Sequence, residues 1–92
     1  MEIKYQVRYL QQVVTTDIPT LDAHVRALIK RAIEERLMID PIAFGKPLRY
    51  SLKGHRRLRV GDYRIVYRIE PATKIVLIIA IKHRKAVYED EF

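Results

Sequence analysis

The residues of this 92-residue sequence that are best suited to chemistry are cations placed around a pair of turn residues in the C-terminal half. Arg57 and Arg64 lie on either side of Gly61-Asp62, and Lys82 follows an apolar run. If these segments are strands, a side-chain period of two directs all three cations to one face of a sheet. Such a group can stabilise the charge that builds on phosphate oxygens when a ribose 2′-hydroxyl attacks the adjacent phosphate, without any metal.

Other kinds of active site find little support in the sequence. The histidines, His24, His55 and His83, are scattered and there is no cysteine, so we expect neither a metal shell nor thiolate chemistry. The three glycines are isolated rather than grouped in a phosphate-binding loop, and Asp62 and Glu70 are explained by turns. We therefore expect no metal and no small-molecule cofactor.

The net charge of +7 is carried by the C-terminal half of the chain. Residues 46–88 hold twelve basic residues against two acidic ones, whereas residues 1–45 hold six of each. A basic domain of this kind commonly binds RNA, DNA or the ribosome, and an acidic protein partner is the alternative.

Length and composition predict one domain over residues 1–92. The chain is 49% hydrophobic and 32% charged, which is typical of a folded protein rather than a disordered or membrane-embedded one. Met1–Tyr9 lacks the apolar run of a signal peptide, and no segment approaches the roughly 18 apolar residues of a membrane span. We expect a cytoplasmic protein with no membrane partner.

The N-terminal half predicts a strand and helices. Residues 2–8 alternate between apolar and polar side chains, as in a half-buried strand, and residues 9–16 favour a short helix. Residues 44–48 are interpreted as a loop that leads to a possible short strand at residues 50–52.

The longest predicted helix covers residues 21–37, where apolar residues recur at spacings of three and four. Thr20 or Asp17 offers a side chain that could cap its N-terminus, with Asp22 in the first turn. Asp40-Pro41 should end the helix, because the residue before a proline is pushed out of the helical region.

The C-terminal half predicts a hairpin followed by a buried strand. Residues 55–60 and 63–69 read as two strands joined by a tight turn, and the uniformly apolar residues 75–81 read as a strand covered on much of both faces. Continuing the alternation of this last strand places Val76, Ile78, Ala80 and Lys82 on one side.

These elements predict an α+β fold, in which helices pack on one face of a largely antiparallel four-stranded sheet and the chain ends in a short helix or tail at residues 85–91. Tyr63 and Tyr67 are interpreted as core residues. The residues predicted to form one core between helix and sheet are Leu28, Ile29, Ile33, Leu58, Ile65, Tyr67, Leu77 and Ile79.

Two motifs in this half resemble the RelE branch of the RelE/ParE toxin superfamily. They are the G-x-Y-R-x-V-Y pattern at residues 61–67 and the K-x-R-x-x-V-Y pattern at residues 82–88. The resemblance implies a small RelE-like fold and the toxin of a type II toxin–antitoxin system. RelE-type toxins cleave mRNA in the ribosomal A site without a metal, form a 2′,3′-cyclic phosphate, and are inhibited by a cognate antitoxin.

The resemblance also implies roles for individual residues. Arg64 matches the arginine that contacts the scissile phosphate, Lys82 matches the basic residue before the terminal helix, and Tyr88 matches the tyrosine that stacks on the base and assists proton transfer. Two family lysines fall on His55 and Arg57 here. An arginine stays protonated and cannot act as a base. The general base is then His55, Tyr88 or His83, and the further cations expected to bind RNA are Arg59, Arg68, Arg84 and Lys53.

Two other functions fit the same resemblance. One is a ParE-like inhibitor of DNA gyrase without nuclease activity, and the other is an inactive relative that only binds its antitoxin. A shared face for Arg57, Arg64, Lys82 and Tyr88 favours the nuclease, since a protein that only binds has no need of that set.

Overall fold

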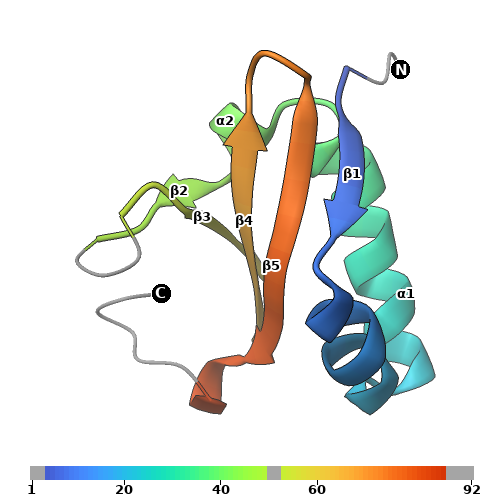
Figure 1. Ribbon diagram of the computed structural model, residues 1–92. Helices are drawn as coiled ribbons and strands as arrows, with labels where there is room; N and C mark the ends of the chain where they lie inside the picture. Colours follow the sequence, from blue (N-terminus) through green and yellow to red (C-terminus); the bar gives the residue numbers. More distant parts are fainter. Residues whose placement is uncertain (1–3, 50–52, 87–92) are drawn as a thin grey trace.

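The computed structural model describes residues 4–49 and 53–86, and these form a five-stranded sheet with the order β1-β5-β4-β3-β2 (Figure 1). The strands are β1 (Gln6–Tyr9), β2 (Lys46–Pro47), β3 (Arg56–Val60), β4 (Tyr63–Glu70) and β5 (Ile75–His83). β1 runs parallel to β5, and all other neighbours are antiparallel. The predicted α+β class is confirmed, but the predicted count of four strands is wrong.

The difference in strand count arises at residues 46–47, which were interpreted as loop. Lys46 and Pro47 pair with Arg57 and Arg56 at the edge of the sheet. A proline is tolerated in an edge strand, because its missing N–H need not face a neighbour. The possible strand at residues 50–52 lies outside the described residues.

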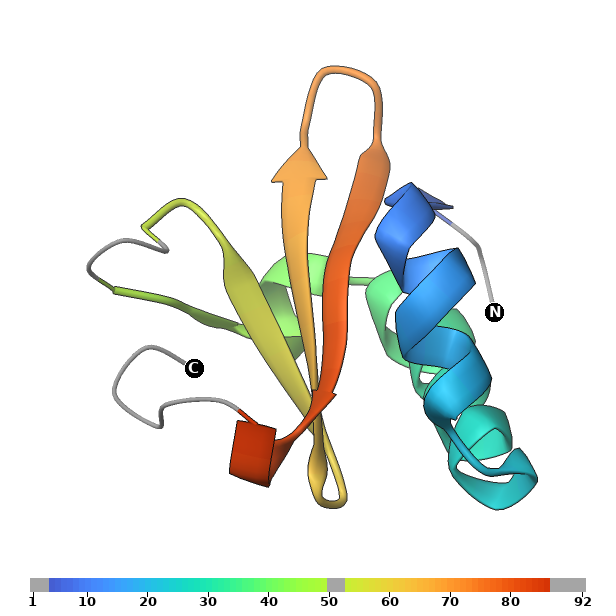
Figure 2. The same cartoon turned by 60° about the horizontal axis from the view of Figure 1, so that its bottom comes forward.

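All described helical segments except the last lie together on one side of the sheet (Figures 1 and 2). Their bounds are η1 (Val13–Asp17), η2 (Ile18–Thr20), α1 (Ala23–Ala32), η3 (Ile33–Leu37) and α2 (Pro41–Phe44). The last segment, η5 (Arg84–Ala86), follows the end of β5 and lies apart from them. The short helix predicted after the first strand is confirmed, and so is the long helix, which α1 and η3 form together.

No helix within residues 4–49 and 53–86 is long and apolar enough to cross a membrane.

Asp22, rather than Thr20 or Asp17, caps the long helix. The Asp22 carboxylate accepts a hydrogen bond from Val25 N at 2.9 Å, so α1 begins two residues later than predicted. Thr20 Oγ1 instead donates to the backbone oxygen of Asp17. Asp40 ends the helical run as predicted and also caps α2 by accepting a hydrogen bond from Ala43 N at 3.1 Å.

The hairpin of β3 and β4 is confirmed. Its turn contains Gly61, whose φ of 58° lies in the left-handed region that glycine adopts without steric cost. The pairing runs from Val60 opposite Tyr63 to Arg56 opposite Tyr67.

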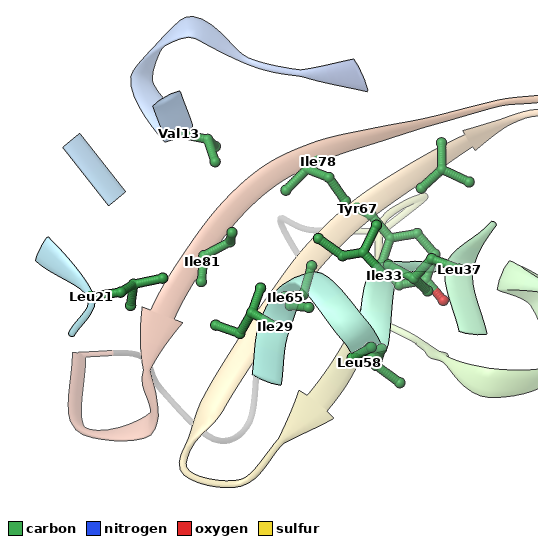
Figure 3. Packing of buried hydrophobic residues seen from close by; sticks show 12 residues of the cluster. Val13, Leu21, Ile29, Ile33, Leu37, Leu58, Ile65, Tyr67, Ile78 and Ile81 are labelled. Atoms are coloured by element: carbon green, nitrogen blue, oxygen red, sulfur yellow. The ribbon is translucent and has the colours of Figure 1, made fainter. Parts of the chain in front are cut away.

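The core lies between the sheet and the helices (Figure 3). Its buried members are Val13, Leu21, Ile29, Ala32, Ile33, Leu37, Leu58, Ile65, Tyr67, Val76, Ile78 and Ile81. Ile29, Ile33, Leu58, Ile65 and Tyr67 are therefore core residues as predicted.

The predicted alternation of β5 is wrong, because the pairing of β4 with β5 shifts register. Val66 lies opposite Ala80, but the next residue, Tyr67, lies opposite Ile78, so Ile79 is an extra residue on β5. The shift turns Ile78 toward the core.

The register shift also corrects two core predictions, those for Leu77 and Ile79. Val76 is a core residue, whereas Leu77 and Ile79 are only half-buried, with Leu77 opposite Arg68. Leu28 is 41% exposed on α1 and does not belong to the core either.

Two side chains of the hairpin hold α2 against the sheet. The hydroxyl of Tyr67, which is fully buried, donates to Pro41 O at 2.6 Å, and Arg56 Nη2 donates to Ile42 O at 2.6 Å and Gly45 O at 2.8 Å. Gly45 permits this close approach, because a Cβ at that position would lie 1.7 Å from Tyr67 Oη. Carbonyls at the end of a helix need such donors.

The register shift predicts different costs for two adjacent truncations. Ile78→Ala should lower the free energy of unfolding by about 2–5 kcal/mol, the range for removing a fully buried large aliphatic side chain. Leu77→Ala should cost about 1 kcal/mol, since Leu77 is only half-buried and its truncation leaves a smaller cavity. Urea unfolding of both variants measures the difference, and equal costs would contradict the observed register.

Tyr67 should make stability fall at high pH. Burial raises the pKa of Tyr67 above its usual value of 10.0. A raised folded-state pKa means that the stabilisation is complete below about pH 10 and is lost as the pH rises through the folded value. Tyr67→Phe should cost about 1–3 kcal/mol near neutral pH, because Pro41 O loses its donor.

The same variant should flatten the loss of stability above pH 10. Urea unfolding from pH 8 to about pH 11 measures this, with Tyr9→Phe as the comparison. The pKa of Tyr9 is also raised by burial and by Glu34, but Tyr9 is 39% exposed. An alkaline loss of stability that Tyr67→Phe leaves unchanged would show that another group controls it.

Candidate active site

Four cations lie on the face of the sheet opposite to the core. Arg59, Arg64 and Lys82 form one row across β3, β4 and β5, since Arg64 is paired with both of the others. Arg57 lies in the next row, opposite Val66. Residues directly opposite each other in an antiparallel pair project to the same side. We refer to Arg57, Arg59, Arg64 and Lys82 as the cationic face.

Arg64 is held close to the hairpin turn. Its Nη1 donates to Tyr63 O at 3.1 Å and to Gly61 O at 3.3 Å, and the residue is only 5% exposed. Its guanidinium is therefore fixed by the turn that precedes it, and a phosphate could reach it only after neighbouring groups move.

Lys82 is bonded to a residue that the sequence did not associate with this site. Lys82 Nζ lies 2.7 Å from Oδ1 of Asp17, whose side chain is 2% exposed. Oδ2 of the same carboxylate accepts a hydrogen bond from Ile81 N at 2.9 Å. In the sequence Asp17 carried only a helix-cap signal, and nothing local indicates a partner 65 positions away.

Arg57 and Arg59 also border a hollow of about 200 Å³ at the β3 edge of the sheet. The residues that line it are Arg36, Phe44, Lys46, Arg57, Leu58 and Arg59. Phe44 is 49% exposed there. Residues 58–60 of β3 lie at this edge beyond β2, which pairs only with Arg56 and Arg57.

The other cations predicted to bind RNA are exposed. Arg68 lies 4.0 Å from a Glu70 carboxylate oxygen, and Arg84 Nε lies 3.7 Å from Asp62 Oδ1. Exposed pairs of this kind contribute little to stability, so these side chains are available to a polyanion at small cost. Lys53 is exposed in the turn before β3.

The structure separates the candidates for the general base. His83 packs edge-on against Tyr63, with ring centroids 5.2 Å apart, and its Nδ1 accepts a hydrogen bond from Lys85 N at 3.1 Å. It follows Lys82 on the strand and therefore projects to the opposite side, away from the cationic face.

Two candidates remain. His55 is half-buried directly before β3, where its backbone oxygen accepts a hydrogen bond from Leu48 N. Tyr88 lies outside the described residues. Among the residues that are described, no three of His, Cys, Asp or Glu are grouped so that they could hold a metal ion.

Comparison with known families gives a match over most of the chain. Residues 7–88 match the family model described as the ParE toxin of the type II toxin–antitoxin system parDE. The chain is 38% identical over 72 residues to toxin RelE of Mycobacterium tuberculosis, covering 78% of this chain and 74% of that protein. It is 33% identical over 72 residues to toxin RelG of the same organism, covering 78% and 83%.

Solved structures share the fold. In the crystal structure of the toxin–antitoxin complex RelBE2 from Mycobacterium tuberculosis, one chain aligns with a TM-score of 0.83 at 31% identity, over 91% of this chain and 95% of that one. The isolated Escherichia coli RelE toxin aligns with a TM-score of 0.70 at 18% identity, over 86% and 83%, and so supports the fold alone. The chain therefore belongs to the RelE/ParE family of toxins of type II toxin–antitoxin systems.

Proposed function

We propose that this toxin is an endoribonuclease that cleaves mRNA on the ribosome and that a cognate antitoxin inhibits it. The observation that carries the proposal is the placement of Arg57, Arg64 and Lys82, from three different strands, on one face of the sheet. The resemblance to RelE-type toxins and the curated relatives named RelE and RelG support it. The proposal places the protein in the cytoplasm, with ribosomes and mRNA as its partners.

In this mechanism the ribose 2′-oxygen attacks the adjacent phosphorus. The general base removes the 2′-hydroxyl proton, the new O–P bond forms, the bond from phosphorus to the 5′-oxygen breaks, and that oxygen takes up a proton. The products are a 2′,3′-cyclic phosphate and a free 5′-hydroxyl. No metal is needed, because charge on the nonbridging oxygens can be stabilised by fixed cations.

The residues divide these tasks. Arg57, Arg64 and Lys82 stabilise the phosphate, and the guanidinium groups remain protonated throughout. We assign proton removal to His55, since an imidazole can accept a proton near neutral pH. Tyr88 is expected to stack on the base and to assist proton transfer, as the resemblance implies. Because Arg64 is 5% exposed in the free toxin, groups around it must move when mRNA binds.

The second candidate function is inhibition of DNA gyrase without nuclease activity. The observation that favours it is the matching family model, which is described as ParE toxin. Both candidates share the fold and the need for an antitoxin, so an activity test has to separate them.

The activity prediction concerns Arg64 and Tyr88. Arg64→Ala and Tyr88→Ala should each lower single-turnover cleavage of ribosome-bound mRNA by about a hundredfold or more, the usual loss when one preorganised transition-state contact is removed. Primer extension on the mRNA gives the cleavage rate. Arg31→Ala is the matched control, since Arg31 is an exposed arginine on α1 whose partner is Glu35.

Two results would contradict the proposal, one for the residue assignment and one for the activity. If neither variant loses cleavage activity, Arg64 and Tyr88 do not carry the chemistry. If the parent toxin leaves mRNA intact but produces gyrase-linked DNA breaks in cells, the gyrase inhibitor is the correct function.

The partner prediction concerns the antitoxin. Solved relatives include complexes of RelE with its antitoxin RelB. We expect the cognate antitoxin to lay an acidic, partly helical segment over or beside the cationic face, folding as it binds. The dissociation constant measured by titration calorimetry should therefore rise with salt between about 50 and 500 mM. Binding that is insensitive to salt would mean that this antitoxin does not act by masking the charges.

A further inference from the structure

Asp17 is a buried carboxylate that the proposed mechanism does not use. Its side chain is 2% exposed, and both carboxylate oxygens are engaged: Oδ1 with Lys82 Nζ at 2.7 Å and Oδ2 with Ile81 N at 2.9 Å. Burial of a carboxylate is costly unless it is paired and hydrogen-bonded. The contacts with Lys82 and Ile81 together therefore offset the cost of burying the Asp17 carboxylate.

The contact with Ile81 replaces a missing strand neighbour. β1 pairs with β5 only as far as Tyr9 opposite Ile78, and Leu10, directly after β1, donates its N–H to Ile78 O at 3.1 Å. The chain then turns into η1, which lies beside the lower part of β5 in Figure 1. Asp17, at the end of η1, accepts the N–H of Ile81, beyond the end of that pairing.

The same contact fixes the carboxylate in space. Thr20 Oγ1 donates to Asp17 O at 2.7 Å, so the backbone carbonyl of Asp17 is held as well. Asp17 Oδ1 is therefore a fixed acceptor at the edge of β5. It is bonded to Lys82, which follows Ile81 and belongs to the cationic face.

The Lys82 side chain would otherwise be mobile, because lysine has a long flexible stem and a point charge that many orientations can satisfy. Its ammonium has three N–H donors, of which the bond to Asp17 Oδ1 uses one. The side chain remains 37% exposed, so the ammonium can meet a ligand while Asp17 holds it.

We propose that Asp17 is a positioning residue, which holds the Lys82 ammonium at the β5 end of the cationic face for the scissile phosphate of RNA. This inference rests on the proposed nuclease function. Asp17 itself does not touch the substrate and acts only through Lys82.

The proposal predicts opposite effects on binding and on rate. The negative charge of Asp17 opposes an anionic ligand, so its removal should leave RNA binding unchanged or make it tighter. Lys82 would lose its fixed position, and a displacement of about 1 Å from a reacting group can cost a hundredfold in rate. A purely structural defect would instead weaken binding and rate together.

The test is Asp17→Asn, which removes the charge but keeps a side-chain oxygen that can accept the Ile81 N–H. In single-turnover cleavage of ribosome-bound mRNA, we expect the maximal rate to fall about tenfold or more and the half-saturating toxin concentration not to rise. Glu35→Gln is the matched control, because it neutralises an exposed carboxylate that pairs with Arg31 on α1. Its rate should equal that of the parent toxin.

A double variant shows whether Asp17 acts through Lys82. Asp17→Asn should have no further effect on rate in a Lys82→Ala background, because the group that it positions is absent. Effects that multiply in the double variant, an unchanged or faster rate in Asp17→Asn, or a loss of binding in proportion to rate would each overturn the proposal.

A second measurement does not depend on activity or on the folding of the variant. In ¹⁵N NMR spectra of the parent toxin, the Lys82 ammonium should be protected from solvent exchange relative to the other lysines, for which Lys53 is an exposed reference. Lys82 exchange as fast as that of Lys53 would overturn the proposal even if Asp17→Asn failed to fold. A protected Lys82 in a toxin that cleaves no mRNA would instead refute the proposed nuclease and leave the contact intact.

Discussion

The register shift between β4 and β5 is the constraint on which both faces of the sheet depend. Because Ile79 is an extra residue opposite the step from Val66 to Tyr67, Ile78 turns toward the helices while Lys82 stays on the side of Arg64. In an unshifted strand, the alternation that buries Ile78 would also turn Lys82 into the core, where an unpaired charge is costly. One extra residue lets the same strand supply the centre of the core and a cation of the opposite face.

The edge of β5 that faces β1 links the N-terminal segment to Lys82. β1 covers only the first part of the edge, and Asp17 satisfies the N–H of Ile81 beyond it. The carboxylate that completes the sheet is therefore the one that holds Lys82. One oxygen of this carboxylate satisfies the sheet edge and the other is bonded to Lys82, so Asp17→Asn is informative because it alters the charge while keeping an acceptor for Ile81 N.

Sequence patterns predicted what depends on local chemistry and missed what depends on pairing. The hairpin at Gly61-Asp62 was predictable from turn residues between alternating strands, and the shared side of Arg57 and Arg64 follows from alternation on those strands. The fate of Leu77 and Ile79 was not predictable, since a run that is apolar at every position carries no alternation that could reveal a bulge. Asp17 was missed because its partners are distant in the sequence.

The arrangement of the cations bears on whether this protein only binds a polyanion or also catalyses a reaction at a phosphate. The isolated Escherichia coli RelE toxin shares the fold at only 18% identity. Folds of one kind host different functions, so the fold alone does not distinguish a toxin that only binds a partner from one that also cleaves RNA. A surface that only attracts an acidic partner works well with mobile, fully exposed lysines, whose field steers association. Here Arg64 is bonded to its own hairpin turn and Lys82 to a buried carboxylate. Holding a cation in one position adds little to the attraction of an acidic partner. It does help to stabilise a transition state, because the stabilising charges must be in place before negative charge develops on the phosphate. The preorganised cations therefore favour phosphate chemistry over binding alone.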